Sequence, residues 1–490
     1  MSLCYNRRMM KIAFLASEVI PYAKTGGLAD VAGALPKYLN KLGADARLFM
    51  PLYREVRKKG LPLETVLDNV EVDLGGRKTA FGVKAHSGNG FPVYFIEKDE
   101  YFDRDFLYGT AAGDYPDNGE RFGFFSLAAL ETVKRLGFAP DVLHCHDWQS
   151  AVALAYLKTV RARDAFFAGT RSLFTVHNLA YQGLFGKDVL GKIGLPGSLF
   201  NMNDLEFWGK ANFLKAGILY STAVSTVSPR YSREIQTPEF GCGLDGLLRS
   251  RSRVLFGLLN GVDYAAWNPA TDTLLPARYK ASDLTGKRVC KAELLKMFGL
   301  TGGVETPVVG IVSRLAGQKG LDIVCDALPS LFALGVRLMI LGTGEAKIQD
   351  SLLEARKVFP TQLGLKIAFD EKIAHTIYAG SDLFLIPSRY EPCGLTQMYS
   401  LRYGTVPVVR ATGGLDDSIR QFDPSTGTGN GFKFEEASPN ALVVAVKKAL
   451  AAFGQPHDWQ ALVRNAFNGD FSWEKSAGEY MNLYRKLAEL

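Results

Sequence analysis

The stretch KIAFLASEVIPYAKTGGLADVAGALPKYLNKLGADARLFM (residues 11–50) decides the fold class of this 490-residue chain. KIAFLA (11–16) is a short apolar run that predicts a strand, and a Gly-rich loop follows it. The residues from Leu28 to Leu42 have the apolar spacing of a helix, and DARLFM (45–50) predicts the next strand. Strand, loop, helix and strand in this order are typical of an α/β fold with parallel strands.

The alternation of apolar runs and helical patterns continues to the end of the chain. Further strands of a first unit are predicted at 92–97, 141–146, 172–177 and 222–228. The pattern restarts with strands predicted at 307–313, 337–344, 365–370, 382–388 and 405–410. Single hydrophobic cores stop growing at about 250–300 residues, so the chain is predicted to form two doubly wound, Rossmann-like α/β domains.

The two predicted domains divide near the turn-forming sequence NGVD (260–263). The N-terminal domain is expected to span 10–254 and the C-terminal domain 255–472. Residues 473–490 predict an amphipathic helix that could pack back on the N-terminal domain. Ligands of doubly wound sheets bind outside the carboxyl ends of the strands, so polar residues that follow strands are the candidate site residues.

The charge and hydrophobicity of the chain limit the kinds of partner that it is expected to bind. The formal charge of +7, from 57 Lys+Arg against 50 Asp+Glu, is mild over this length and suits an anionic small ligand. The sequence has no dense basic stripe interleaved with aromatics, so no nucleic-acid partner is expected. No run approaches the roughly 18–20 apolar residues of a membrane span, so no membrane partner is expected either.

Cysteine usage and the first residues favour a cytoplasmic protein. The six cysteines are scattered, with no CxxC pair and no metal-ligand or disulfide spacing, as in proteins of a reducing compartment. The apolar run from Ile12 to Ala16 is shorter than the roughly 7–15 residues of a secretory signal core. Residues 1–9 are therefore expected to be a dispensable extension.

The loop KTGGLADV (24–31) follows the first predicted strand. Gly26 and Gly27 allow a ligand to approach the backbone, and the helix that opens at Leu28 offers free N–H groups to an anion. Lys24 adds a charge that can meet a phosphate. The alternative is a tight strand-to-helix turn with a solvated lysine. The loop matches neither the Walker loop nor the GxGxxG fingerprint.

The loop SRLAGQKGLD (313–322) opens the second domain. Arg314 and Lys319 lie in it, ahead of a helix expected to start near Gly320. Two cations and a helix N-terminus could hold a departing diphosphate. The alternative is a pair of ordinary surface cations.

The sequence RYEPCGLTQ (389–397) follows another strand and places Glu391 at its end. A carboxylate there could hold sugar hydroxyls, while a helix that begins at Gly394 could bind phosphate. The alternative is a carboxylate that serves the helix macrodipole, which Pro392 in a first turn would also suit. Cys393 is read equally well as a small buried filler or as a reactive thiol.

The sequence HCHDWQS (144–150) invites a metal interpretation, because His144 and His146 share one face of a strand. No segment supplying further ligands is evident, so Asp147 is expected instead to cap the next helix, line the cleft, or do both. A DxD sequence at Asp103 and Asp105 is attributed to chance.

Seven motifs together resemble the bacterial glycogen synthase and plant starch synthase family. They are KTGGL (24–28), HDW (146–148), HNxxxQG (177–183), NGVD (260–263), SRLxxQKG (313–320), EPCGLTQ (391–397) and TGGLxD (412–417). The resemblance runs from about Met10 to the C-terminus. It implies the GT-B fold, with an active site in the cleft between two Rossmann-like domains. It also implies ADP-glucose as donor, an α-1,4-glucan such as glycogen as acceptor, retention of configuration, and neither metal nor cofactor.

The resemblance also implies roles for the motif residues. Lys24, beside Gly27, is expected to contact the donor phosphate or sugar. Arg314 and Lys319 are expected to neutralise the departing ADP, and Glu391 to hold the glucosyl ring. Further catalytic residues are His177, placed against the transferring sugar, and Asp147. The substrate-binding set is completed by Asp30, Asn178, Asn260, Phe369 (against adenine), Cys393, Gly394, Leu395 and Thr396.

The reaction implied is transfer of glucose from ADP-glucose to the non-reducing end of an α-1,4-glucan. Sister families carry a second Glu eight residues after Glu391, where this chain has Tyr399. Without a second carboxylate, front-face attack on the side of ADP departure is favoured over a covalent intermediate. Three alternatives stay open: a related UDP-glucose-dependent transferase, a glucan-binding protein without turnover, and an NAD-dependent oxidoreductase, which the missing GxGxxG disfavours.

Overall fold

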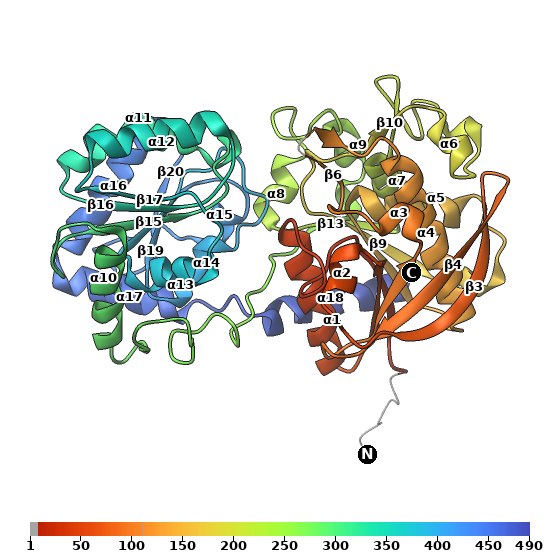
Figure 1. Ribbon diagram of the computed structural model, residues 1–490, viewed down its shortest axis with the longest axis horizontal. Coiled ribbons are helices and arrows are strands. Elements are labelled where there is room, and N and C mark those ends of the chain that lie inside the picture. Colours follow the sequence, from red (N-terminus) through yellow and green to blue (C-terminus); the bar gives the residue numbers. More distant parts are fainter. Residues whose placement is uncertain (1–7, 111) are drawn as a thin grey trace, which may run out of the picture. The chain divides into compact units, whose positions relative to one another are not determined.

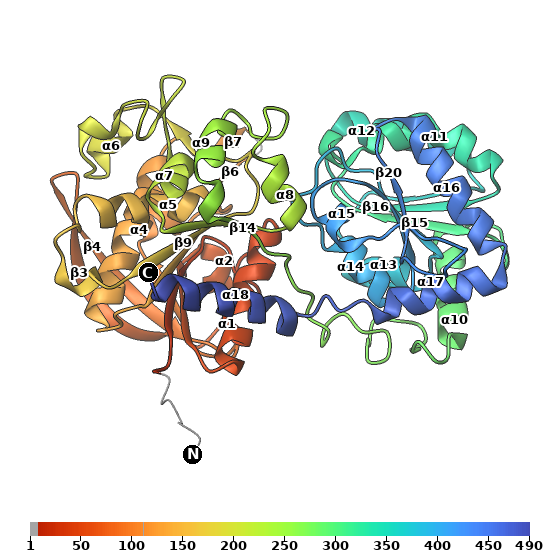
Figure 2. The same cartoon turned by 180° about the vertical axis from the view of Figure 1, so that it is seen from behind.

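The computed structural model describes residues 8–110 and 112–490, which form two compact units (Figures 1 and 2). Unit 1 comprises the chain up to Val227, Ser232–Gly261 and Trp473–Leu490, and unit 2 comprises Ser228–Tyr231 and Val262–Ser472. Residues 1–7 lie outside the described residues, so the expected extension over residues 1–9 is largely untested.

Unit 1 is built on a nine-stranded sheet in the order β14-β13-β9-β8-β1-β2-β5-β4-β3. Its strands are β1 (Lys11–Leu15), β2 (Asp45–Pro51), β3 (Glu64–Leu74), β4 (Arg77–His86), β5 (Val93–Glu97), β8 (Val142–His146), β9 (Arg171–Val176), β13 (Ala223–Thr226) and β14 (Leu255–Gly257). All pairings are parallel except those of the hairpin β3–β4 and of β4 with β5.

Helices and short strands complete unit 1. The helices are α1 (Gly27–Lys41), α2 (Arg54–Lys58), α3 (Asp99–Phe102), α4 (Asn118–Arg135), α5 (Asp147–Lys158), α6 (Val189–Lys192), α7 (Phe213–Tyr220), α9 (Asp245–Ser250) and α18 (Trp473–Ala488), and α8 (Pro229–Glu234) crosses the division between the units. The short pieces are β6 (Gly109–Thr110), β7 (Gly113–Asp114), β10 (Leu184–Phe185), β11 (Glu206–Phe207), β12 (Lys210–Asn212), η1 (Ala165–Phe167), η2 (Gly197–Leu199) and η3 (Ser252–Val254). The helix α1 buries Leu28, Val31, Leu35 and Leu39, the i, i+3, i+7 pattern of a helix packed on a sheet.

Unit 2 has a six-stranded, all-parallel sheet in the order β17-β16-β15-β18-β19-β20. Its strands are β15 (Val308–Val312), β16 (Arg337–Leu341), β17 (Leu363–Lys366), β18 (Leu383–Ile386), β19 (Val406–Arg410) and β20 (Phe432–Phe434). Numbered within the unit, this is the order 3-2-1-4-5-6 of a Rossmann fold.

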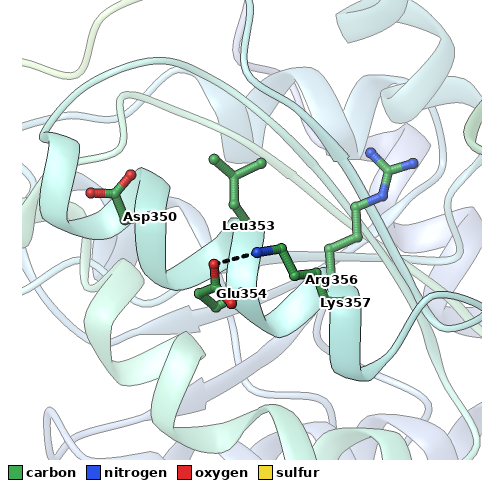
Figure 3. A pocket seen from close by; sticks show the side chains of 5 residues that line it. All are labelled: Asp350, Leu353, Glu354, Arg356 and Lys357. Atoms are coloured by element: carbon green, nitrogen blue, oxygen red, sulfur yellow. Dashed lines mark hydrogen bonds and ion pairs between the residues drawn. The ribbon is translucent and has the colours of Figure 1, made fainter.

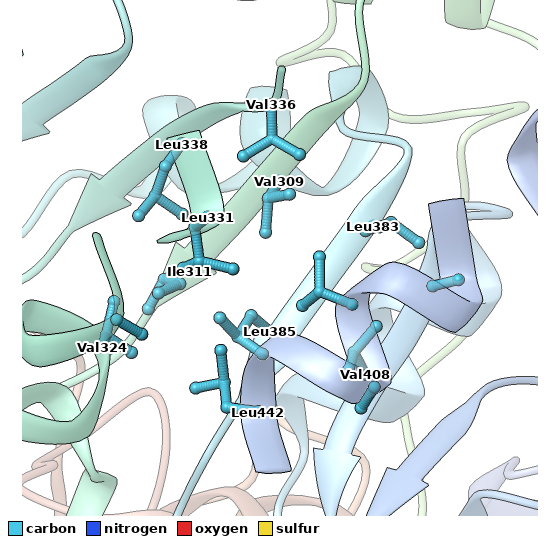
Figure 4. Close-up of a cluster of buried hydrophobic side chains, with 14 of the residues drawn as sticks. Val309, Ile311, Val324, Leu331, Val336, Leu338, Leu383, Leu385, Val408 and Leu442 are labelled. Carbon is cyan, nitrogen blue, oxygen red and sulfur yellow. The ribbon is translucent and has the colours of Figure 1, made fainter. Parts of the chain in front are cut away.

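Helices cover both faces of the unit 2 sheet. They are α10 (Thr285–Phe298), η4 (Gly317–Lys319), α11 (Leu321–Ala333), α12 (Ala346–Val358), α13 (Glu371–Gly380), α14 (Thr396–Arg402), α15 (Gly413–Ser418), α16 (Pro439–Phe453) and α17 (Pro456–Asn468). One buried cluster joins the sheet to α11, α12 and α16 (Figure 4), and a second joins it to α10, α13 and α14. Burying both faces explains why these strands read as continuous apolar runs.

Each unit has one point where the strand order reverses. In unit 1 it lies between β1 and β8, and in unit 2 between β15 and β18. The loops that leave these strand pairs diverge, and the crevice between them is where doubly wound folds bind ligands. Most polar residues singled out in the sequence follow one of these four strands.

The predicted α/β class with two Rossmann-like sheets is confirmed, and each predicted strand is present within a few residues. The antiparallel hairpin β3–β4 was missed, although the turn pair Gly75–Gly76 joins its strands. No helix among the described residues is both long and apolar enough to cross a lipid bilayer.

Candidate functional site

The switch point of unit 2 brings two opposite charges together. Lys319, in the loop after β15, places Nζ 2.6 Å from Oε2 of Glu391, in the loop after β18. The hydroxyl of Ser388 donates to the same oxygen at 3.0 Å. Glu391 is 7 % exposed, and its Oε1 makes no hydrogen bond to any described residue. The site therefore combines a fixed cation with a carboxylate oxygen that is available to a ligand hydroxyl.

Two glycines allow the backbone to pack closely around this pair. Gly320 has φ +69°, and a Cβ there would lie 2.2 Å from the carbonyl oxygen of Pro387. Gly413 has φ +45°, and a Cβ there would lie 2.0 Å from the carbonyl oxygen of Glu391. The next residue, Gly414, donates its N–H to that same carbonyl at 3.1 Å. The QKG and TGGL motifs thus hold the Lys319 and Glu391 loops in place through backbone contact.

Arg314 lies in the same loop as Lys319 but is exposed. Its Nη2 donates to Oε1 of Gln318 at 3.2 Å. The loop is held by Arg389, whose guanidinium pairs with both carboxylate oxygens of Asp322 at 2.7 Å and donates to the carbonyl of Gly317. Arg314 is thus an exposed cation on an anchored loop, suited to an anionic ligand.

The helix predicted to begin at Gly394 begins two residues later. α14 starts at Thr396 with Leu395 as its N-cap residue, because Gly394 adopts the left-handed region at φ +69° and cannot continue a helix. Cys393 is buried and does not form a disulfide with a described residue. Phe369, expected to stack on adenine, is 93 % exposed.

The switch point of unit 1 is organised by a carboxylate that sequence reasoning missed. Glu18, in the loop after β1, is 4 % exposed and accepts hydrogen bonds from Thr25 Oγ1 (2.6 Å), from the backbone N–H of Gly26 (2.9 Å) and from the Tyr108 hydroxyl (2.7 Å). It fixes the start of the Gly-rich loop. Lys24, predicted to meet donor phosphate, forms an ion pair with Asp30 at 2.7 Å.

The two glycines of this loop face open space. A Cβ added to Gly26 or Gly27 would meet nothing within 4 Å. Neither has the positive φ that demands glycine. The chain's own packing therefore does not require glycine here, which agrees with a loop that a ligand approaches. Beside it, burial raises the pKa of the Asp30 carboxyl, and Lys24 partly offsets that rise.

His177, after β9, is joined to the segment after β8 by two hydrogen bonds. Its backbone N–H donates to Oδ1 of Asp147 at 2.7 Å, and its Nε2 lies 3.0 Å from Nδ1 of His146. Burial raises the pKa of Asp147 to about 7 and lowers that of His177 to about 3. Near neutral pH the imidazole is thus uncharged, while the carboxyl can gain or lose a proton.

Asp147 does not cap the following helix, contrary to one expectation. It is the first residue of α5, the N-cap residue is His146, and the side chain of His146 makes no capping hydrogen bond. Asp147 has φ +53°, an unusual value for a non-glycine residue, and its carboxylate accepts the N–H of His177 instead.

The other polar candidates have structural partners. His144 uses Nε2 with Thr175 at 2.6 Å and Nδ1 with Tyr484 at 2.8 Å. Among residues 8–110 and 112–490, no group of three or more His, Cys, Asp or Glu is arranged to hold a metal. The carboxylates of Asp103 and Asp105 both bind Arg54, which gives the DxD sequence a structural role.

The two asparagines expected to line the cleft differ in their surroundings. Asn178 accepts the N–H of Ala180 at 3.1 Å and is partly exposed. Asn260 is 4 % exposed, and its Oδ1 has no partner within the described part of the chain.

The sequence analysis did not predict three of the residues that form these two switch points: Glu18, Tyr108 and Ser388. Glu18 carried a usable signal, since it is an acidic residue three positions after β1. Tyr108 carried none, because it reaches Glu18 across 90 positions of sequence.

A hollow on the surface of α12 is unrelated to these residues. It is lined by Asp350, Leu353, Glu354, Arg356 and Lys357, all from that one helix (Figure 3). Within it, Lys357 forms an ion pair with Glu354. No strand end contributes to it.

Comparison with known proteins shows the family to which the chain belongs. Residues 11–250 match the family model of the starch synthase catalytic domain, and residues 299–465 match that of glycosyl transferases group 1. A glycogen synthase of Syntrophotalea carbinolica is 48 % identical over 98 % of this chain and 99 % of that protein. A glycogen synthase of Koribacter versatilis is 46 % identical over 98 % of this chain and 99 % of its own length.

Solved structures agree as well. The catalytic domain of starch synthase IV from Arabidopsis thaliana, bound to ADP and acarbose, has a TM-score of 0.89 and 34 % identity over 99 % of this chain and all of that one. A sucrose-phosphate synthase from Thermosynechococcus elongatus, at TM-score 0.61 and 16 % identity, shares the fold. The chain therefore belongs to the glycogen synthase and starch synthase family and is a hexosyltransferase with the GT-B fold.

Proposed function

We propose that this protein transfers glucose from ADP-glucose to the non-reducing end of an α-1,4-glucan, with retention of configuration, in glycogen synthesis. The observation that carries the proposal is the Lys319–Glu391 pair at the switch point of unit 2. It supplies the two groups that a nucleotide-sugar donor needs, a cation for the diphosphate and a carboxylate oxygen for the sugar. The ADP held by the Arabidopsis relative supports the choice of nucleotide.

In this proposal unit 2 is the donor side. A lysine ammonium has three donor hydrogens, so Lys319 can bind phosphate oxygens while it stays paired with Glu391. Arg314 adds a planar guanidinium suited to two phosphate oxygens. Glu391 accepts a sugar hydroxyl through Oε1. Gly394, Leu395 and Thr396 bind phosphate, with Cys393 beside them and Phe369 against the adenine ring.

Unit 1 is the side of the acceptor and of the reacting sugar. His177 contacts the transferring glucosyl group as a neutral hydrogen-bonding ring. Lys24 leaves its ion pair with Asp30 and contacts the donor instead. The substrate approaches the backbone at Gly27, where no other residue lies close. Asp147, Asn178 and Asn260 complete this set. The three parts at 10–254, 255–472 and 473–490 remain the proposed functional domains.

We propose front-face attack for the chemical step. The acceptor hydroxyl oxygen bonds to C1 of glucose on the face from which ADP departs, and the bond from C1 to the phosphate oxygen breaks. The acceptor proton passes to that phosphate oxygen. Lys319 and Arg314 stabilise the negative charge of the departing diphosphate, as fixed cations in a low-dielectric site can. Glu391, tied to Lys319 and Ser388, holds the donor and is not the nucleophile.

The decisive assay measures transfer of labelled glucose onto glycogen from ADP-glucose and, separately, from UDP-glucose, with a chelator present. Chelator-resistant transfer with a strong preference for ADP-glucose is the expected result. Preference for UDP-glucose would contradict the donor assignment and keep the reaction class. Binding of glycogen without transfer from either donor would contradict the enzymatic role.

We also expect the protein to act in the cytoplasm. No disulfide joins the five described cysteines, as in proteins of a reducing compartment. They are Cys145, Cys242, Cys290, Cys325 and Cys393.

A further inference from the structure

His146 is a buried titratable residue to which the proposed mechanism gives no task. Its ring has no exposed surface and lies parallel to the ring of Phe14, 5.7 Å away between centroids. Nδ1 faces Nε2 of His177 at 3.0 Å, whereas Nε2 has no hydrogen-bond partner among the described residues. The contact between the two histidines is thus the sole polar contact of the His146 ring within the described chain.

The hydrogen bond between the two rings has two possible directions. If His146 carries its proton on Nδ1, it donates to His177, and the buried Nε2 of His146 is left as an unpaired acceptor. If His177 donates instead, the proton of His146 must sit on Nε2, as a buried N–H without a partner. Orphaned buried N–H groups are rarer than under-satisfied acceptors, so the first direction is favoured.

Both imidazole rings are uncharged near neutral pH, so each exists as one of two neutral tautomers. Burial lowers the pKa of His146 well below its ordinary value, and it lowers that of His177 to about 3. A doubly protonated ring, which would have no tautomer to choose, is therefore not populated near neutral pH.

We propose that His146 is a positioning residue that donates from Nδ1 to Nε2 of His177 and so fixes the proton of His177 on Nδ1. Nδ1 of His177 forms no hydrogen bond to a described residue, and His177 keeps 8 % of its surface exposed while His146 has none. The ring thus presents an N–H donor to an oxygen of the bound sugar. This role rests on the proposed function of His177 as a sugar contact.

Asp147 and His146 together hold the orientation of the His177 ring. The main chain of His177 is fixed by its N–H bond to Asp147, so the bond from His146 controls the orientation of the side chain. His144, two residues earlier on β8, is equally buried but bonds to Thr175 and Tyr484. His144 therefore serves as the control for burial and ring packing, because its ring lies 4.0 Å from that of His146 between centroids but makes no bond to His177.

The first test needs no variant at His146. The chain has six histidines, so ¹⁵N-histidine labelling gives few ring signals, and His177→Asn identifies those of His177. Two-bond ¹H–¹⁵N correlation spectra of the free enzyme at pH 7 distinguish the tautomers. We expect His177 to be protonated on Nδ1. Protonation on Nε2 would overturn the proposal, whatever the substrate proves to be.

The second test compares His146→Phe, His146→Asn and His144→Phe. Phe keeps the ring shape and removes the donor, whereas the Asn amide nitrogen takes about the place of Nδ1. We expect His146→Phe to allow His177 to leave the Nδ1-protonated tautomer. We expect kcat to fall about 10- to 100-fold, by analogy with partners that orient metal-bound histidines. His146→Asn should restore both, and His144→Phe should leave the His177 signals unchanged.

The outcomes separate this proposal from the role of His177 itself. If His146→Phe shifts the tautomer but leaves kcat unchanged while His177→Asn abolishes transfer, the positioning role is wrong. If His177→Asn keeps full transfer, the proposed sugar contact has failed, and the spectra still decide the direction of the hydrogen bond.

Discussion

The two switch points share a topology and differ in electrostatics. In unit 2 the loops after β15 and β18 join a lysine to a glutamate in a partly buried ion pair. In unit 1 the loop after β1 contributes Glu18, which accepts hydrogen bonds from a backbone N–H and a hydroxyl. The segment after β8 contributes Asp147, whose pKa is raised to about 7 by burial. The first arrangement suits an anionic leaving group, and the second suits sugar hydroxyls. The same strand order thus carries two kinds of chemistry, set by a few residues after each strand.

The largest expected effect comes from breaking the charge pair of unit 2. Glu391→Gln keeps the shape of the side chain and removes the charge that faces Lys319, so transfer from ADP-glucose should fall about 10²- to 10³-fold, as for other preorganised groups in active sites. Glu354→Gln, which removes an exposed pair with Lys357, should leave the rate unchanged. A rate for Glu391→Gln within about threefold of the unmodified enzyme would mean that Glu391 does not hold the donor.

Alanine variants of two glycines should have different effects, because Gly413 lies in a closely packed loop and Gly27 in a loop that faces the ligand. Gly413→Ala forces a methyl group against the Glu391 carbonyl at a positive φ, so it should lower the free energy of unfolding by about 2 kcal/mol or more. Gly27→Ala points into open space and should keep stability within about 0.5 kcal/mol, while transfer falls about tenfold. Thermal unfolding and initial rates are the measurements. Loss of stability in Gly27→Ala would contradict an open loop.

The pH dependence of kcat/KM should reflect the titration of Asp147 in unit 1. Because burial raises the pKa of Asp147 to about 7, kcat/KM should change near pH 7, and Asp147→Asn should remove that change. His177, with a pKa of about 3, should add no inflection between pH 5 and 9.

Stability supplies a second readout of the same carboxyl. The raised pKa means that the folded state keeps a proton that the unfolded state loses, so this group's contribution to stability falls as pH rises from about 4 to about 7. Relative to Asp147→Asn, the unmodified protein should lose about 4 kcal/mol over that range in denaturant unfolding. A constant difference across the range would show that the Asp147 pKa is not raised.

The smallest effect is expected at His144. Tyr484→Phe removes a buried hydrogen bond to His144 Nδ1 and should cost about 1 kcal/mol of stability. Transfer should stay unchanged, since His144 does not contact His177. A large loss of activity at unchanged stability would instead link α18 to the reaction.

Much of the fold was predictable because both units bury both faces of their parallel strands. Strands such as β15 and β18 therefore stand out as apolar runs bounded by loops. The hairpin β3–β4 was missed because β3 is half exposed and lacks a continuous apolar run. Its signals were the apolar–polar alternation of Val70–Leu74 and the Gly75–Gly76 turn.

The candidate site was predictable only in part. Lys319 and Glu391 follow strands, but their contact depends on the strand order, which no local pattern contains. Asp147 was expected to cap its helix because residue type alone favours a cap, whereas its partner lies 30 residues away. Glu18 meets Tyr108 across 90 residues, so only the folded chain brings them together.

The difference between the switch points is tested most directly by measuring the dissociation constant of ADP and the transfer rate in the same set of variants. We predict that Lys319→Met weakens ADP binding at least about tenfold, because a fixed cation for the diphosphate is lost. Asp147→Asn and His177→Asn should bind ADP within about twofold of the unmodified enzyme and still lose transfer. Weaker ADP binding in the unit 1 variants, with normal binding in Lys319→Met, would contradict the assignment of the donor site to unit 2.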